Sequence, residues 1–211
     1  MRKQSMWNLA ATAITLLVLS TSAWADAFGD VYRVTGNLLN AADYSGSGTL
    51  LGSFTAPAIN FIVPEGQGTS NPLSEFLSSG SASYTSMSNL GDVMSNCPPA
   101  TTGCYSTAVH VWGVGDFVNG NTYTITHDDG VIMTLDGSPF ITAAGPVSAQ
   151  PDSEVFGGTT GQHSFSIWYM ATNGNPEVLQ SNIPVPDGGM TLMLLGGVLV
   201  GLETLRRKFR A

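Results

Sequence analysis

Hydrophobic and polar residues alternate in short segments through most of the chain, with a period of two. In the segment 121–127, Tyr123 and Ile125 fall on one face and threonines on the other. The segment 164–170 repeats this alternation, and its residues Phe165, Ile167 and Tyr169 are expected to face the protein interior. A period of two is typical of β-strands that bury one face. No sustained 3.6-residue period occurs between residues 26 and 184, which argues against a helical domain.

The alternating segments are separated by Gly-, Ser-, Asn- and Pro-rich stretches, so we expect many short strands joined by turns. The pattern predicts strands over 31–39, 49–54, 59–63, 81–87, 108–114, 121–127, 130–136, 164–170 and 177–180. One helical turn is expected over 72–78, and a turn over 173–175. Strands of this length and spacing predict an all-β fold, an antiparallel β-sandwich.

The N-terminus has the pattern of a secretory signal peptide. Arg2 and Lys3 precede an apolar run over 9–19, and Ala23 and Ala25 form an Ala-x-Ala cleavage site. Residues 1–25 are therefore expected to be a signal peptide read by the Sec export machinery. The alternative is an uncleaved anchor, which the short apolar run and the small-residue site disfavour.

The C-terminal segment 190–205 is apolar on every side except for Glu203, and a cluster of basic residues follows it. A helix of this length spans about 24 Å, less than the ~30 Å of a hydrocarbon core, but local thinning of the bilayer allows it to cross. We therefore expect a transmembrane helix with the basic tail 206–211 in the cytoplasm, as the positive-inside rule requires. An amphipathic or buried terminal helix is the alternative, although the segment has no polar stripe.

This tail resembles the PEP-CTERM sorting signal in three parts that occur in the same order. They are the motif Val185, Pro186, Asp187, Gly188 and Gly189, the short apolar stretch, and the basic end Arg206, Arg207 and Lys208. The resemblance implies processing by an exosortase, transient residence in the inner membrane, and release to the cell surface or extracellular space of an exopolysaccharide-producing cell. The family's Pro-Glu-Pro is replaced by Pro186-Asp187-Gly188, which leaves the cleaved bond open.

Between the two ends lie an expected ectodomain over 26–181 and a stalk with the sorting motif over 182–189. Residues 26–189 hold one cation, Arg33, against fourteen acidic residues, a net charge of −13 compared with −8 for the whole chain. Such a surface repels nucleic acid and attracts divalent cations. Solubility of an exported domain is the simpler explanation of the same charge.

The two cysteines, Cys97 and Cys104, flank a Pro- and Gly-containing loop. In an oxidising compartment this spacing predicts a local disulfide. A zinc site is not expected, because neither a Cys-x-x-Cys motif nor clustered histidines accompany the pair.

The block 120–137 is the most distinctive stretch of the domain. It reads as a strand, a tight Asp128-Asp129-Gly130 turn, a second strand, and another turn at Asp136-Gly137. Aspartate followed by glycine is common in hairpin turns because glycine adopts positive φ without strain. The pattern thus predicts a hairpin with Gly130 at its turn.

Over about 111–180 the chain resembles PA14-like β-sandwiches, through this Asp-Asp-Gly block and the later segments 165–169 and 176–180. The resemblance implies a non-catalytic fold that often binds carbohydrate. In its lectin branch, two adjacent aspartates hold a calcium ion that coordinates sugar hydroxyls, and by position these are Asp128 and Asp129. Calcium takes six to eight oxygen ligands, and the sequence assigns only this pair, so a plain turn stays the alternative.

Catalysis is not expected from the sequence. His127 adjoins Asp128, but neighbouring residues of a strand point to opposite faces, which gives no triad geometry. Gly-x-Ser-x-Gly, His-Glu-x-x-His and phosphate-binding loops are all missing from the sequence. The sequence therefore predicts an exported surface or matrix protein, structural or glycan-binding, with extracellular polysaccharide as a partner and calcium as its one candidate cofactor. The alternative is a secreted hydrolase of such a polysaccharide.

Overall fold

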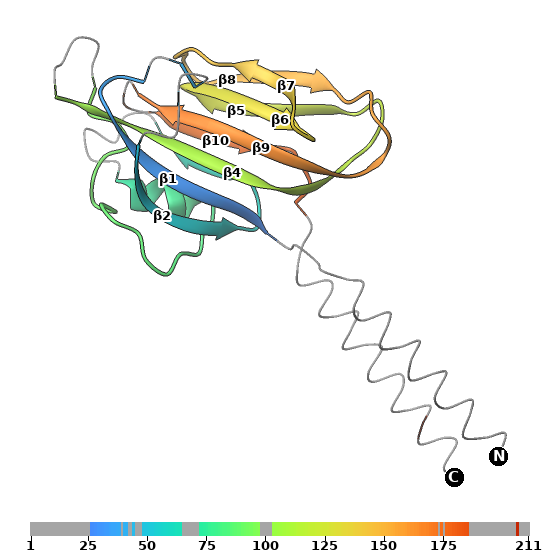
Figure 1. Ribbon diagram of the computed structural model, residues 1–211, viewed down its shortest axis with the longest axis horizontal. Coiled ribbons are helices and arrows are strands. Elements are labelled where there is room, and N and C mark those ends of the chain that lie inside the picture. The colour runs from blue at the N-terminus through green and yellow to red at the C-terminus, as the bar shows by residue number, and fades with distance from the viewer. Residues whose placement is uncertain are drawn as a thin grey trace. The chain divides into compact units, whose positions relative to one another are not determined.

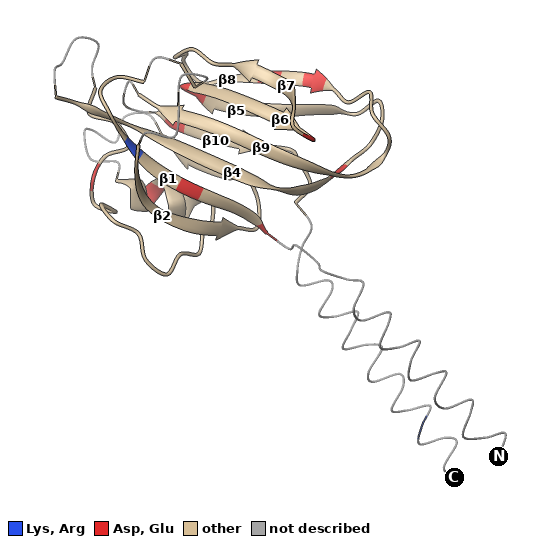
Figure 2. Ribbon diagram, in the orientation of Figure 1, with Lys and Arg blue, Asp and Glu red and all other residues tan. Residues whose placement is uncertain are grey.

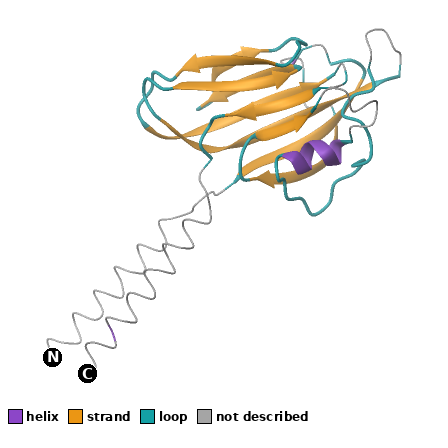
Figure 3. Ribbon diagram, turned by 180° about the vertical axis from the view of Figure 1, so that it is seen from behind, coloured by secondary structure: helices purple, strands orange, loops and turns teal. Residues whose placement is uncertain are grey.

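The computed structural model describes residues 26–38, 40–41, 44, 48–64, 72–97, 103–172, 174, 176–185 and 206. The strands lie within one compact unit, Asp26–Pro186. They form two antiparallel sheets that face each other, with one short helix beside them (Figures 1 and 3). The predicted β-sandwich is thereby confirmed.

The larger sheet has six strands in the order β2-β1-β4-β9-β6-β7. Its members are β1 (Ala27–Thr35), β2 (Thr49–Ala56), β4 (Tyr105–Phe117), β6 (Gly130–Leu135), β7 (Ser138–Ala143) and β9 (Gly161–Ala171). The smaller sheet has the order β3-β10-β5-β8. Its members are β3 (Asn60–Val63), β5 (Thr122–Asp128), β8 (Gln150–Val155) and β10 (Glu177–Ser181).

The core lies between the two sheets and consists of the apolar side chains on the inward face of each alternating strand. Tyr123 and Ile125 of β5 are buried, as are Phe165, Ile167 and Tyr169 of β9, so the predicted inward faces are correct. Burying each large apolar side chain stabilises the fold by about 1.5–3 kcal/mol. The same packing fixes the register, because a slip of one residue would turn every apolar side chain outward.

The helix α2 (Leu73–Ser79) closes one part of this core next to β3. Its buried face consists of Leu73, Phe76 and Leu77. The ring of Phe76 stacks on that of Phe61 at 5.1 Å and on that of Tyr169 at 5.8 Å. The expected helical turn is thus a helix, held by aromatic stacking.

The sequence pattern misses two strands at sheet edges and misplaces the first strand. The structure contains two further strands, β7 and β8, and both lie at sheet edges. β7 contains Pro139, and β8 is almost wholly exposed. Neither strand therefore shows a clear alternation of buried and exposed residues in the sequence. The first strand lies over Ala27–Thr35 instead of 31–39, because it begins with small inward residues and ends before Gly36, which has φ +93°.

The predicted strand 81–87 is wrong. Ser83 and Met87 form only isolated bridges with Thr55 and Gly52 of β2. Most of the segment is exposed, and Ser81 has φ +54°, so the chain there has neither a buried face nor a continuous extended backbone.

The predicted Asp-Asp-Gly hairpin is also wrong, because β5 and β6 belong to different sheets. Asp129 is the single residue between them and carries the chain from one layer to the other. Gly130 does not have positive φ; a Cβ there would lie 2.4 Å from the carbonyl oxygen of Ala144. Glycine is required at this position by close packing instead of by turn conformation.

Both terminal predictions fall outside the described residues. This holds for the signal peptide 1–25 and the transmembrane helix 190–205, and both stay predictions. Of the helices within the described residues, none combines the length and the apolar character needed to span a membrane.

Candidate functional site

Asp128 and Asp129 lie where the chain passes from the smaller sheet to the larger one. Both are buried, with 5% and 2% of their surfaces exposed, and the peptide bond between them is cis. Asp128 is paired with Val178 of β10, and the Asp129 amide donates to the carbonyl oxygen of Met170 in β9. The two sequence-predicted residues are therefore fixed between the central strands of both layers.

A third carboxyl group, that of Glu177, is fully buried close to this pair. Burial in the first place, and then the negative charges of Asp129 and Asp128, raise the pKa of Glu177 well above its usual value, against the lowering effect of a hydrogen bond from Tyr169. The Tyr169 hydroxyl donates to Glu177 Oε2 at 2.7 Å and also to the carbonyl oxygen of Asp128. Glu177 Oε1 is also buried, and it has no hydrogen-bond partner among the described residues.

His127 supports the pair from the neighbouring position on β5. Its ring is completely buried, with Nδ1 at 2.5 Å from the carbonyl oxygen of Asp129 and Nε2 at 2.7 Å from Asp152 Oδ2 on β8. These contacts hold the ring inside the sandwich and join β5 to β8 through the His127–Asp152 pair. His127 thus supports the backbone at Asp129.

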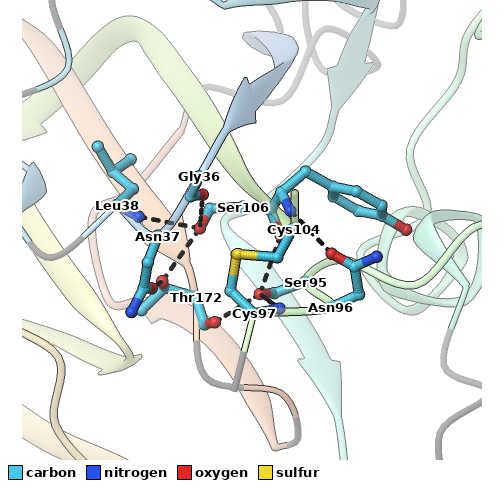
Figure 4. Close-up of a disulfide and its surroundings, with 10 residues drawn as sticks. Gly36, Asn37, Leu38, Ser95, Asn96, Cys97, Cys104, Ser106 and Thr172 are labelled. Atoms are coloured by element: carbon cyan, nitrogen blue, oxygen red, sulfur yellow. Dashed lines mark hydrogen bonds between the residues drawn. A yellow bond between two sulfur atoms is a disulfide. The ribbon is translucent and has the colours of Figure 1, made fainter. Parts of the chain in front are cut away.

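Thr172, the residue that follows β9, holds one oxygen of Asp129. Its amide donates to Asp129 Oδ2 at 2.8 Å, and its carbonyl oxygen accepts a 2.5 Å bond from the Ser95 hydroxyl. Its own hydroxyl donates to Asn37 Oδ1 and lies 3.0 Å from the Ser106 hydroxyl (Figure 4). The fully buried Thr172 is thus hydrogen-bonded to residues from elsewhere in the sequence, which are Asn37, Ser95, Ser106 and Asp129.

The predicted disulfide between Cys97 and Cys104 is present beside this threonine (Figure 4). The Cys97 amide donates to the Ser95 hydroxyl at 3.2 Å, and the Gly36 amide donates to the Cys104 carbonyl oxygen at 2.7 Å. Both cysteines are buried. The disulfide residues are therefore hydrogen-bonded to Ser95 on one side and to Gly36, after the end of β1, on the other.

No lysine or arginine of the domain balances the acidic cluster. Arg33 is the one such residue between positions 26 and 189, and its Nη1 bonds Asp92 at 2.7 Å while its guanidinium lies over the ring of Tyr105 (Figure 2). Within the described residues, no three or more His, Cys, Asp or Glu side chains converge in a group that could hold a metal ion.

The second predicted turn is a turn in the structure as well. Asp136 and Gly137 both have positive φ, +49° and +79°, and they connect β6 to β7. Consecutive positive φ values are those of the type I′ turn that two-residue hairpins favour. Asp136 lies at the far end of β6 from the acidic pair and belongs to a separate set of contacts.

Most residues of the predicted sorting and export signals fall outside the described residues. Of the motif, only Val185 is described; Pro186 to Gly189 are not, and neither are Ala23, Ala25, Arg207 and Lys208. Arg206 is described as an exposed residue. These assignments stay predictions.

Sequence reasoning missed Thr172, Tyr169 and Glu177 as neighbours of the acidic pair. It also missed Ser95 and Asn37, which hydrogen-bond Thr172. Thr172 contacts Ser95 across 77 positions and Asn37 across 135. No local motif marks such residues, because their roles depend on which strands the sandwich brings together.

Several solved structures share this fold. The PA14 domain of the antifreeze protein MpAFP is 20% identical with a TM-score of 0.52, over 77% of this chain and 82% of that one. A PA14 sugar-binding domain from an RTX adhesin is 19% identical with a TM-score of 0.51, over 74% and 88%. The A domain of epithelial adhesin 9 from Candida glabrata, in complex with Galβ1-4GlcNAc, is 10% identical with a TM-score of 0.50, over 77% and 82%.

No family model matches the sequence, and no curated protein matches it significantly. At these levels of identity the structural likeness concerns the fold, and it agrees with the resemblance that the Asp-Asp-Gly pattern carries. The domain of this chain thus has the fold of PA14 domains.

Proposed function

We propose that this protein is an exported, exosortase-sorted component of the cell surface or extracellular matrix, and that its sandwich binds glycan with the help of calcium at Asp128 and Asp129. The observation that carries the proposal is the placement of two adjacent carboxylates in a fixed setting between the two sheets, with 5% and 2% exposure. The likeness to a sugar-binding domain and to an adhesin domain in complex with a disaccharide supports the glycan part.

The oxygen atoms at the site are of the kind that a hard cation prefers, although Asp128, Asp129 and Glu177 do not converge into a metal-holding group in the described residues. Carboxylate oxygens are preferred calcium ligands, and Glu177 Oε1 is a buried carboxyl oxygen without a hydrogen-bond partner beside the pair. Like charges that are buried close together disfavour one another, and a divalent cation relieves that repulsion. Asp128 and Asp129 would hold the ion, and the bound ion would supply a positive centre for sugar hydroxyls to coordinate.

Calcium binding is tested by calorimetry and thermal melting of the full chain. We expect binding to the wild type, with stabilisation of about 2.7 kcal/mol when free calcium is a hundredfold above the dissociation constant. The variant Asp128→Asn/Asp129→Asn should show neither heat nor a rise in melting temperature. A matched control, Asp116→Asn/Glu154→Gln, removes two exposed charges elsewhere and should bind like the wild type.

Glycan binding is tested by retention on a panel of immobilised polysaccharides, with and without a chelator. We expect retention that the chelator and the Asp128→Asn/Asp129→Asn variant abolish. The release of reducing ends is measured in the same samples. Release without stable retention would refute the binding function and favour a secreted hydrolase.

A further inference from the structure

Thr172 connects the acidic pair to the disulfide through its backbone. It has no exposed surface, its amide holds Asp129 Oδ2 at 2.8 Å, and its carbonyl oxygen accepts the 2.5 Å bond from Ser95. One bond involves the amide and the other the carbonyl oxygen of the same residue. Ser95 and the Asp129 carboxylate are therefore linked through the backbone of Thr172.

Ser95 in turn depends on the disulfide loop. Its hydroxyl oxygen accepts a bond from the Cys97 amide at 3.2 Å, and Cys97 is covalently joined to Cys104, the residue before β4. Asn96, between Ser95 and Cys97, is also fixed, because its Oδ1 accepts a 2.8 Å bond from the Tyr105 amide. Cys97 and Asn96 thus hold Ser95 by contacts on its C-terminal side, and the Ser95 hydroxyl lies between the Cys97 amide and the Thr172 carbonyl oxygen (Figure 4).

We propose that Ser95 and Thr172 are positioning residues that couple the Cys97–Cys104 disulfide to the Asp129 carboxylate, so that the disulfide loop sets the affinity of the acidic pair for a divalent cation. The affinity part rests on the proposed function. A carboxylate whose orientation is already fixed loses less side-chain freedom on binding an ion, and thereby binds it more tightly. Without the disulfide or the Ser95 hydroxyl, both carboxylates would stay in place, but the Asp129 carboxylate would have a wider range of orientations.

The test combines two measurements on the full chain. The first is hydrogen exchange of the Thr172 amide by NMR in the presence of a chelator, which reports the bond to Asp129 without any metal. The second is the calcium affinity by calorimetry. The variants are Ser95→Ala, which removes the hydroxyl, and Ser95→Thr, which keeps it. Cys97→Ala/Cys104→Ala opens the loop by an independent route.

For Ser95→Ala we expect Thr172 exchange to be about five- to tenfold faster, and calcium affinity to be lower by a similar factor, as the loss of one net hydrogen bond predicts. The double cysteine variant should likewise speed Thr172 exchange and lower the calcium affinity. Ser95→Thr should keep both values near those of the wild type. Ser164→Ala is the matched control. It removes a hydroxyl bond to Asp136 at the other end of β6 and should change neither measurement.

Unchanged Thr172 exchange in Ser95→Ala would overturn the coupling, as would an equal acceleration in Ser164→Ala. Faster exchange with unchanged calcium affinity would overturn the positioning role. A wild type that binds no calcium while Thr172 exchange responds to Ser95→Ala would refute the calcium function and uphold the link between the disulfide and Asp129.

Discussion

Asp136 and His163 form an ion pair that ties the β6–β7 turn to β9. His163 Nδ1 lies 2.6 Å from Asp136 Oδ2, and its Nε2 lies 2.7 Å from the Thr159 carbonyl oxygen. The hydrogen bond to Asp136, and then that to Thr159, raise the pKa of His163 above 6.5. The bond from His163, and then that from the Ser164 amide, lower the pKa of Asp136 below 3.8.

These pKa shifts define the pH range over which the pair stabilises the fold. The contribution of His163 is complete below pH 6.5 and is lost as the pH rises through its folded pKa. The contribution of Asp136 is present above pH 3.8 and is lost as the pH falls through its folded pKa. Stabilisation by the pair is therefore greatest between these two values.

The variant Asp136→Asn isolates the charge of this pair, since asparagine also tolerates the φ of +49° at this position. At about pH 5.5 we expect its melting temperature to be lower than that of the wild type. The difference in melting temperature should shrink above about pH 8, because His163 loses its proton. The effect is small, because the pair is exposed to solvent. Thermal melts of both proteins across this range provide the measurement, and a difference independent of pH would contradict it.

The crossing from β5 to β6 depends on the lack of a side chain at Gly130. An alanine there would place its Cβ 2.4 Å from the Ala144 carbonyl oxygen and 2.6 Å from Met170 Cε, so the backbone of a neighbouring segment would have to move. We expect Gly130→Ala to lower the free energy of unfolding by about 1–3 kcal/mol, the usual cost of overpacking.

Chemical denaturation of Gly130→Ala beside Gly145→Ala checks this expectation. Gly145 also lacks positive φ, and a Cβ added there would have nothing within 4 Å, so its substitution should leave the midpoint nearly unchanged. Equal midpoints for the two variants would show that the close approach at Gly130 does not constrain the crossing.

Strands that bury one full face can be predicted from the sequence, and those at sheet edges cannot. Tyr123 and Ile125 mark β5 correctly because the alternation reports a buried face directly. The polar edge strand β8 buries too little for any pattern to form. The crossing at Asp129 resembles a hairpin in the sequence, because Asp-Asp-Gly suits a turn whether or not the flanking strands pair.

The candidate site is predictable only as far as it is local. Asp128 and Asp129 are adjacent, and so are visible as a motif, and the short spacing of Cys97 and Cys104 indicates their disulfide. Thr172 joins these two features through bonds to Ser95 and Asp129, which are 77 and 43 positions away. Such contacts follow from the order of strands in the sheets, which alternation alone does not determine.

Charge divides the whole chain into an acidic domain and two basic ends. Six of the seven lysines and arginines lie within residues 1–25 and 190–211, and only Arg33 lies between them. Removal of the N-terminal segment takes away two positive charges. Removal of the segment after Gly189 takes away four positive charges and Glu203. Removal of both segments would therefore change the net charge from −8 to −13.

If the tail is a sorting signal, protein released from the cell surface should begin at Asp26 and end within the motif Val185 to Gly189. Intact-mass measurement gives both ends, and the more negative form should elute later from an anion exchanger than the full chain, because it carries more net negative charge. A variant with Arg206, Arg207 and Lys208 changed to Gln tests the signal: we expect its release to fall, since the positive charge that orients the segment drops from four residues to Arg210 alone. Recovery of the full-length chain from the inner membrane alone would show that the segment 190–205 is a permanent anchor, and the acidic domain would then act at the membrane surface instead of in the matrix.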